Sequence, residues 1–189
     1  MGAPSHFTEP TMAKTLLLAG AAALVAAPLL LAASQPDSFR VERRTVVEAP
    51  PARVHALIND LRQFNTWNPY ERKDPALRGE YRGPQAGAGA QYHFAGNRDV
   101  GRGSLTIVSV TPTAVTMDLH MAEPFESRNT VEFVLTPRGG ATEVTWAMHG
   151  PAHFAGKLLG LFIDMDGMIG RDFEAGLAGL KARAERSAG

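Results

Sequence analysis

The stretch 49–70, APPARVHALINDLRQFNTWNPY, is the part of this 189-residue chain from which the fold can be worked outward. Pro50 and Pro51 suit the first turn of a helix. The apolar residues that follow recur at the spacing i, i+3, i+4 and i+7, which makes one helical stripe: Val54, Leu57, Ile58 and Leu61. Pro69 limits any helix through Trp67. The stretch therefore predicts a short amphipathic helix that leads into an aromatic segment.

Segments of alternating apolar and polar residues lie on both sides of this helix. Residues 39–47 alternate before it, although Arg43 and Val46 weaken the pattern. After it, the clearest strand is 115–121, and residues 105–110 are apolar on both faces, which favours a place inside a sheet. Further strands are predicted at 91–95, 130–136 and 143–148, with turns at 84–89, 96–103, 111–113 and 138–140. Short strands joined by short turns predict an antiparallel meander.

After Gly150-Pro151 the apolar period becomes helical. The residues that step by three or four are Leu158, Phe162, Met165, Ile169, Phe173, Leu177 and Leu180. The region also contains four glycines that each cost about 1 kcal/mol in a helix relative to alanine, namely Gly156, Gly160, Gly167 and Gly170. They indicate either a break near Asp166-Gly167 or missing side chains that leave room for a ligand. Overall the pattern predicts an α+β fold, a curved antiparallel sheet wrapped around a long C-terminal helix with a cavity between them.

The N-terminal segment has a different character from the rest of the chain. From Thr15 to Pro36 there is no charged residue, and about 20 apolar residues span a bilayer. A secretory signal peptide has the same shape, with small residues at 32–34 suited to cleavage. We therefore expect residues 1–36 to be a single-pass membrane anchor or a signal segment with its linker, and residues 37–189 to be the folded domain. The start at Met1 or Met12 and the orientation stay open. Either form of targeting sends the domain across the membrane, whereas an inverted anchor keeps it cytoplasmic.

Composition excludes several classes of function. The formal net charge is zero, so there is no electrostatic case for nucleic-acid binding. The chain has no cysteine and therefore no disulfide, thiolate metal site or thiol nucleophile. His149 and His153 have a metal-binding spacing, but Gly150 and Pro151 between them place them on no common helical face, and we interpret both as surface residues. We assign no metal, no cofactor and no catalytic residue, and the oligomeric state stays open.

One acidic pair is ambiguous. In Asp164-Met165-Asp166, the second carboxylate lies near the edge of the apolar helical stripe. Asp166 either caps or breaks the helix at Gly167, or it is a buried carboxylate, whose raised pKa would be a sign of function.

The order of these features resembles a known family. The segments that carry the resemblance are Ala49-Pro50-Pro51, Leu57-Ile58-Asn59-Asp60, Trp67-Asn68-Pro69, the meander, and 168–177 with Leu180-Lys181. From Phe39 to Glu185 the chain resembles the START/Bet v 1-like (SRPBCC) superfamily, and most of all its polyketide cyclase/dehydrase-like branch. The resemblance implies a helix-grip fold with a deep apolar cavity that binds lipids, sterols or polyketides. It specifies chemistry poorly, because some members are enzymes and no catalytic set is shared.

We therefore expect a membrane-tethered or exported module that binds a hydrophobic small molecule such as a lipid or a polyketide. The alternatives are a cyclase, dehydratase or hydrolase acting in the same cavity, and an interaction domain whose cavity is filled by its own side chains. The residues predicted to line the cavity are Trp67, Tyr70, Tyr92, Phe94, Met117, Met121, Phe133, Trp146, Met148, Met165 and Asp166. Each is alone also a plausible core residue.

Overall fold

The computed structural model describes residues 10–186, so Met1, one of the two candidate starts, lies outside the described part of the chain. The described residues form two compact units. One consists of residues 10–37 together with 152–164, and the other of residues 38–151 together with 165–186. The inclusion of residues 152–164 in the unit of the N-terminal segment was not foreseen from the sequence.

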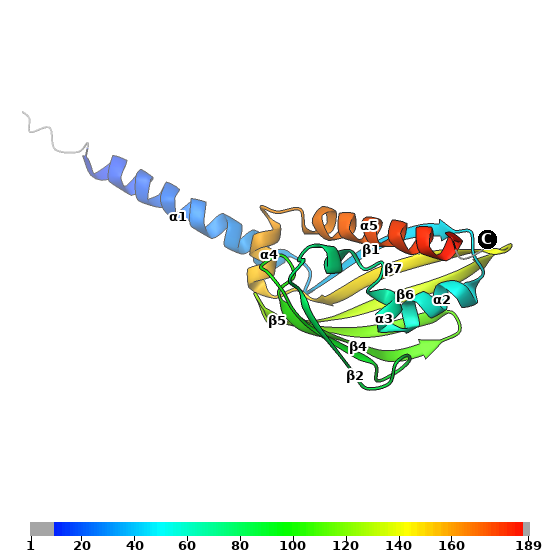
Figure 1. Cartoon of the computed structure of the whole chain (residues 1–189). Helices are drawn as coiled ribbons and strands as arrows, with labels where there is room; N and C mark the ends of the chain where they lie inside the picture. Colours follow the sequence, from blue (N-terminus) through cyan, green and yellow to red (C-terminus); the bar gives the residue numbers. More distant parts are fainter. Residues whose placement is uncertain (1–9, 187–189) are drawn as a thin grey trace, which may run out of the picture. The chain divides into compact units, whose positions relative to one another are not determined.

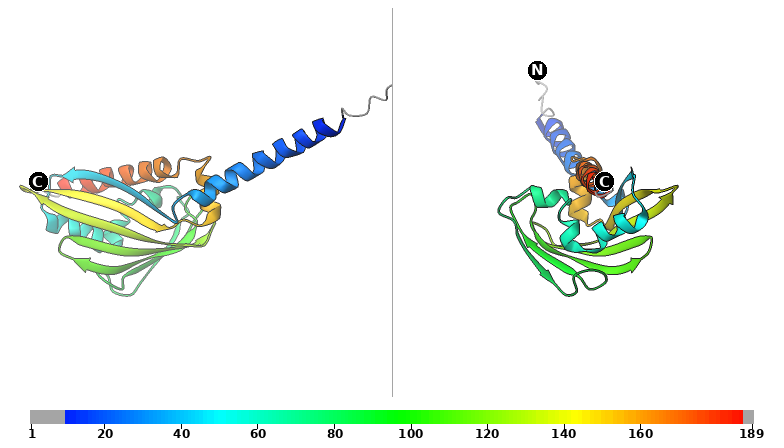
Figure 2. Two further views of the ribbon diagram at one scale, coloured as in Figure 1. Left: turned by 180° about the vertical axis from the view of Figure 1, so that it is seen from behind. Right: turned by 45° about the vertical axis from the view of Figure 1, so that its right-hand side comes forward.

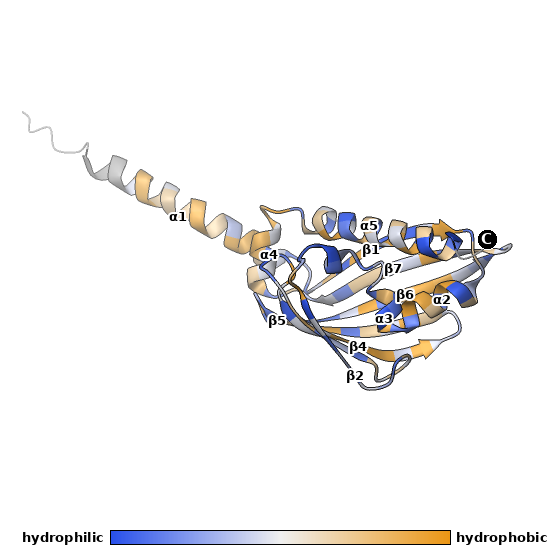
Figure 3. Cartoon of the chain, in the orientation of Figure 1, coloured by the Kyte–Doolittle hydropathy of each residue, from blue (hydrophilic) through white to orange (hydrophobic). Residues whose placement is uncertain are grey.

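The first unit is built from two helices. Helix α1 spans Pro10–Ser34 and contains a stretch, Thr15–Ser34, that is long and apolar enough to cross a membrane. Figure 3 shows the coloured part of this helix as mostly hydrophobic, with a few paler segments. Most of its apolar side chains from residue 15 onward are exposed, and helix α4, Phe154–Gly160, contacts it within the unit. A signal sequence passes the same test of length and composition.

The second unit is a seven-stranded antiparallel sheet with helices on its inner side (Figures 1 and 2). The strand order is β1-β7-β6-β5-β4-β3-β2, a meander in which β1 joins the far edge. The strands are β1 Ser38–Val47, β2 Arg78–Arg82, β3 Gln91–Ala95, β4 Arg102–Thr111, β5 Ala114–Glu123, β6 Ser127–Arg138 and β7 Ala141–Pro151. The helices are α2 Pro51–Asn59, α3 Leu61–Phe64, the 3-10 helix η1 Pro69–Arg72, and α5 Met165–Arg186. The predicted curved antiparallel sheet around a long C-terminal helix is therefore confirmed.

Two local predictions need correction. Leu61 does not continue the first helix, because the Asp60 side chain accepts hydrogen bonds from the backbone N–H groups of Arg62 and Gln63 and so begins α3. Strand β2 was missed, since only Tyr81 among its five residues is apolar and large, and this leaves no alternation to detect.

The predicted break between a short helix and a long one is present, a few residues before Asp166-Gly167. Residues 161–164 separate α4 from α5, so Asp166 and Gly167 belong to the first turn of α5. Gly170 leaves room for the Arg43 side chain rather than for a ligand, because a Cβ there would lie 1.9 Å from Nη2 of Arg43. Arg43 points inward from β1 and binds Asp166 at 3.0 Å and Glu174 at 2.9 Å, which explains why an arginine interrupts the apolar pattern of that strand.

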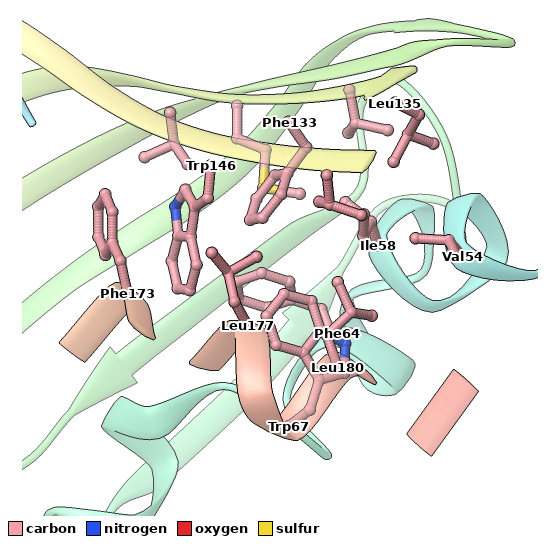
Figure 4. Packing of buried hydrophobic residues seen from close by; sticks show 14 of the residues in the cluster. Val54, Ile58, Phe64, Trp67, Phe133, Leu135, Trp146, Phe173, Leu177 and Leu180 are labelled. Atoms are coloured by element: carbon pink, nitrogen blue, oxygen red, sulfur yellow. The ribbon is translucent and has the colours of Figure 1, made fainter. Parts of the chain in front are cut away.

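The core lies between the sheet and helices α2, α3 and α5, and aromatic rings dominate it (Figure 4). Trp146 of β7 stacks on Phe173 of α5, with ring centroids 4.2 Å apart and an interplanar angle of 9°. On its other side it meets Phe133 at 5.0 Å and Trp67 at 5.8 Å. A Cβ at Gly176 would lie 2.5 Å from the Trp146 ring, so this glycine allows α5 to approach the sheet closely.

Candidate functional site

Side chains on the inner face of the sheet are fully buried at one end of the strands, the closed half, and only partly buried at the other. At one end, side chains such as Ile107, Val115, Leu135 and Val144 are 2% exposed or less. Toward the other end of the same strands, Leu119 and Met121 of β5 and Phe94 of β3 are only partly buried. Alternation in a strand places these residues on one face. The apolar surface therefore continues along the strands, but its side chains are less completely buried toward this end. We call Phe94, Leu119 and Met121 the open half of the inner face.

Five of the eleven predicted lining residues lie in the closed half. Trp67, Met117, Phe133 and Trp146 are 3% exposed or less and pack against one another or against α5. Met148 is 9% exposed and belongs to the same cluster. These side chains hold the fold together, and a ligand could reach most of them only by displacing other core residues.

One core group lacks a partner. The indole Nε1 of Trp146 is buried and has no hydrogen-bond acceptor among the described residues. In Figure 4 this nitrogen lies on the side of the ring that faces Phe173, away from Trp67. A buried donor left unpaired costs about 1–3 kcal/mol, and such groups in native proteins usually have a reason.

Polar side chains form a second group beside the open half. The Tyr92 hydroxyl donates to Oε1 of Glu71 at 2.7 Å, and Lys73 binds Asp172 at 2.6 Å. Burial raises the pKa of Glu71, although the hydrogen bond from Tyr92 opposes this shift. Burial, with the Asp172 carboxylate, also raises the pKa of Tyr70. Of the predicted residues, Tyr92 therefore pairs with Glu71 and Tyr70 with Asp172. The sequence analysis did not single out these two acidic partners.

The raised pKa of Glu71 gives a pH prediction. Glu71 binds its proton more tightly when folded, so its stabilising contribution is present below the unfolded pKa of about 4.5 and is lost as pH rises through the folded pKa. The stability of Glu71→Gln relative to the native chain should therefore increase with pH over that window. Glu80→Gln is the matched control, because Arg82 lowers the pKa of Glu80 and the relative stability should fall instead. The Glu71 effect lies above about pH 4.5 and the Glu80 effect below it, so urea unfolding from about pH 3 to 7 measures both. Slopes of the same sign for the two variants would contradict the assignment.

Two predicted lining residues lie at the surface. Met165 and Asp166 are exposed in the first turn of α5, and Asp166 pairs with Arg43. The suggested buried carboxylate at Asp166 is therefore wrong, and the ion pair accounts for its place at the edge of the apolar stripe.

A hollow of about 470 Å³ lies on the outer face of the sheet, over β2 to β5. A row of polar side chains crosses it in register, namely Glu80, His93, Ser104 and His120. The hollow is open, and it lies on the face opposite Tyr92 and Leu119. His149 lies on this outer face as well, 3.4 Å from Glu132. Within residues 10–186 no three histidine or acidic side chains converge as metal ligands.

Comparison with known proteins places the chain in a family. Residues 38–185 match the family described as polyketide cyclase / dehydrase and lipid transport. The chain belongs to this family. The match covers the whole sheet and nearly all of α5, and it confirms the resemblance drawn from the sequence. No curated protein matches the chain.

Solved structures agree on the fold. Protein CV1439 from Chromobacterium violaceum superposes with a TM-score of 0.55 at 14% identity, over 80% of this chain and 99% of the other. Ara h 8.0201 gives 0.57 at 10% identity, over 79% and 99%. The Aha1 dimer from Colwellia psychrerythraea gives 0.56 at 16% identity, over 80% and 99%. At these identities the likeness establishes a Bet v 1-like fold alone.

Proposed function

We propose that this chain is a membrane-tethered module that binds a hydrophobic small molecule, lipid-like or polyketide-like, against the open half of the inner face. The observation that carries the proposal is the thinning cover over Phe94, Leu119 and Met121 on a face that is otherwise tightly packed. Membership of a family described by polyketide cyclases and lipid transport supports the same class of ligand.

Apolar burial would supply most of the affinity. Each CH₂ group of the ligand that leaves water contributes about 0.8 kcal/mol. Polar groups would orient the ligand rather than supply most of the affinity. The methionine at 121 suits an adaptable wall, since its unbranched side chain fills irregular space.

A second candidate is an enzyme of the cyclase or dehydratase kind in the same place. The observation that favours it is the half-buried Glu71, with its raised pKa, hydrogen-bonded to Tyr92. Both groups already satisfy each other, as do Lys73 and Asp172, so we rank binding without turnover first. Turnover of an added polyketide that is lost in Glu71→Gln, with ligand binding retained, would reverse this order.

Native mass spectrometry of the purified full chain tests the binding function. We expect a population whose mass exceeds that of the polypeptide by one apolar molecule, released on denaturation and soluble in organic solvent. The variant Met121→Glu should lose this population, because a carboxylate would then face the apolar ligand. Val108→Glu, on an exposed position of β4, should keep it. A chain that always has the bare polypeptide mass, and that takes up no added lipid, would favour the filled core.

The tether makes a separate prediction. A span of 20 residues without charge should keep the full chain in the membrane pellet after an alkaline wash, because only detergent removes a transmembrane helix. Leu24→Arg with Leu17→Arg should release the chain, since an arginine in the centre of a span costs about 2.5–3.5 kcal/mol. Recovery of the native chain in the soluble fraction, with an intact N-terminus by sequencing, would contradict the tether.

A further inference from the structure

The unit of α1 and α4 exposes an unusual amount of apolar surface outside the candidate span. Phe162 is 74% exposed, and Phe154, Leu159 and Ile163 are between 42% and 48% exposed. They lie on α4 and on the turn that follows it, in which the N–H groups of Phe162 and Ile163 both donate to the Leu159 carbonyl. We call residues 153–163 the apolar segment. Such clustering on a surface usually marks a site of interaction.

The only lysine or arginine of the apolar segment is turned away from solvent. The side chain of Lys157 is 8% exposed, and its Nζ lies 3.0 Å from the Gln35 carbonyl oxygen and 2.5 Å from Oδ1 of Asp37. The backbone N–H of Ala152 also donates to the Asp37 carbonyl at 2.8 Å. These bonds attach the apolar segment to the residues that directly follow α1.

This attachment fixes the level at which the apolar segment must lie if α1 spans a bilayer. Residues 35–37 come directly after the last residue of the candidate span, Ser34, so they would stand at the headgroup region. Side chains bonded to them stand at nearly the same level. Exposed phenylalanine and leucine side chains gain free energy there by entering the boundary between headgroups and acyl chains.

We propose that the apolar segment, through Phe154, Leu159, Phe162 and Ile163, docks onto the surface of the same bilayer that α1 enters. The inference rests on the proposed membrane tether. Lipid is the occupant that the charges favour, because Lys157, the one lysine or arginine of the apolar segment, is engaged with Asp37. For that reason the docking should need no anionic lipid and should persist at high salt.

The absence of cysteine allows a direct test in the full chain. Single cysteines at Gly160 and Gly20 would carry an environment-sensitive fluorophore, since a Cβ at either position meets nothing within 4 Å. Gly160→Cys keeps all four apolar side chains and reports on the apolar segment, and Gly20→Cys reports on the span. Ser109→Cys, exposed on β4, is the aqueous control. Each labelled chain is reconstituted into phosphatidylcholine vesicles that contain lipids spin-labelled at a shallow or a deep acyl position.

We expect the label at 160 to emit at shorter wavelength and to be quenched several-fold more by the shallow spin label than the label at 109. Adding Phe162→Asp should abolish this quenching and leave the quenching at 20 by the deep spin label unchanged. If 20 is quenched and 160 is not, the tether stands and the docking is wrong. A blue shift at 160 without lipid quenching would indicate a protein contact and also overturn the docking. If 20 itself escapes quenching, the tether fails and the docking fails with it.

Discussion

Replacing Trp146 with alanine should lower the free energy of unfolding by about 3–5 kcal/mol, the range typical of large aromatic truncations in a core. Trp146 is 3% exposed, stacks on Phe173 and contacts Phe133 and Trp67, so the cavity left behind has walls on every side. Aromatic pairs add about 0.5–1.5 kcal/mol each beyond area burial. Chemical unfolding followed by circular dichroism measures the loss.

Two further variants serve as controls for the stability loss expected in Trp146→Ala. Val108→Ala, at a position 52% exposed, should change stability by no more than about 0.5 kcal/mol. Trp146→Phe keeps a ring against Phe173 and removes the unpaired N–H, so it should lose much less stability than Trp146→Ala. If Trp146→Ala behaved like Val108→Ala, Trp146 would line a cavity instead of filling the core.

The order of elements could be predicted because each is marked locally. Alternation marks β5 and β7, and Pro50-Pro51 with the apolar stripe marks α2. Strand β2 could not be predicted, because it is a polar edge strand that forms through its pairing with β3 rather than through its own residues. Arg43 interrupts the alternation of β1, and its role could not be predicted because its partners, Asp166 and Glu174, lie more than 120 residues away in the sequence.

For the candidate site, the sequence predicted which side of the sheet each residue faces, but not how deeply the residue is buried. Alternation indicated that Met117, Met121, Phe133 and Trp146 face inward, yet it cannot tell which of them other elements then cover. Met117 lies under full cover and Met121 does not, although they are four residues apart on one strand. Glu71 was missed because its interest comes from Tyr92 and from burial, neither of which is visible in the local sequence.

The second large effect concerns binding. Leu119→Glu should weaken the binding of an apolar ligand at least tenfold, because it places a carboxylate on the open half where the ligand would lie. Leu119 is only partly buried, so the side chain can reach water and the fold should survive. A charge at Met117 or Trp146 is a poorer test, since both are enclosed and the variant would unfold. Val108→Glu is the matched control and should bind like the native chain.

The most direct test of the proposed function is the dependence of affinity on ligand chain length. The full chain in detergent micelles of fixed composition is loaded with an environment-sensitive apolar probe, which fatty acids of increasing length then displace. Because micelles also take up the longer fatty acids, the affinity is calculated from the concentration of fatty acid that stays dissolved in water. Native protein and Val108→Glu should show an affinity that rises about fourfold per added CH₂, up to a limit set by the site, from about 0.8 kcal/mol for each buried group. Leu119→Glu should show the same trend displaced to weaker binding. Binding that is not saturable, or affinity that does not change with chain length in the native protein, would contradict a hydrophobic ligand site on the inner face.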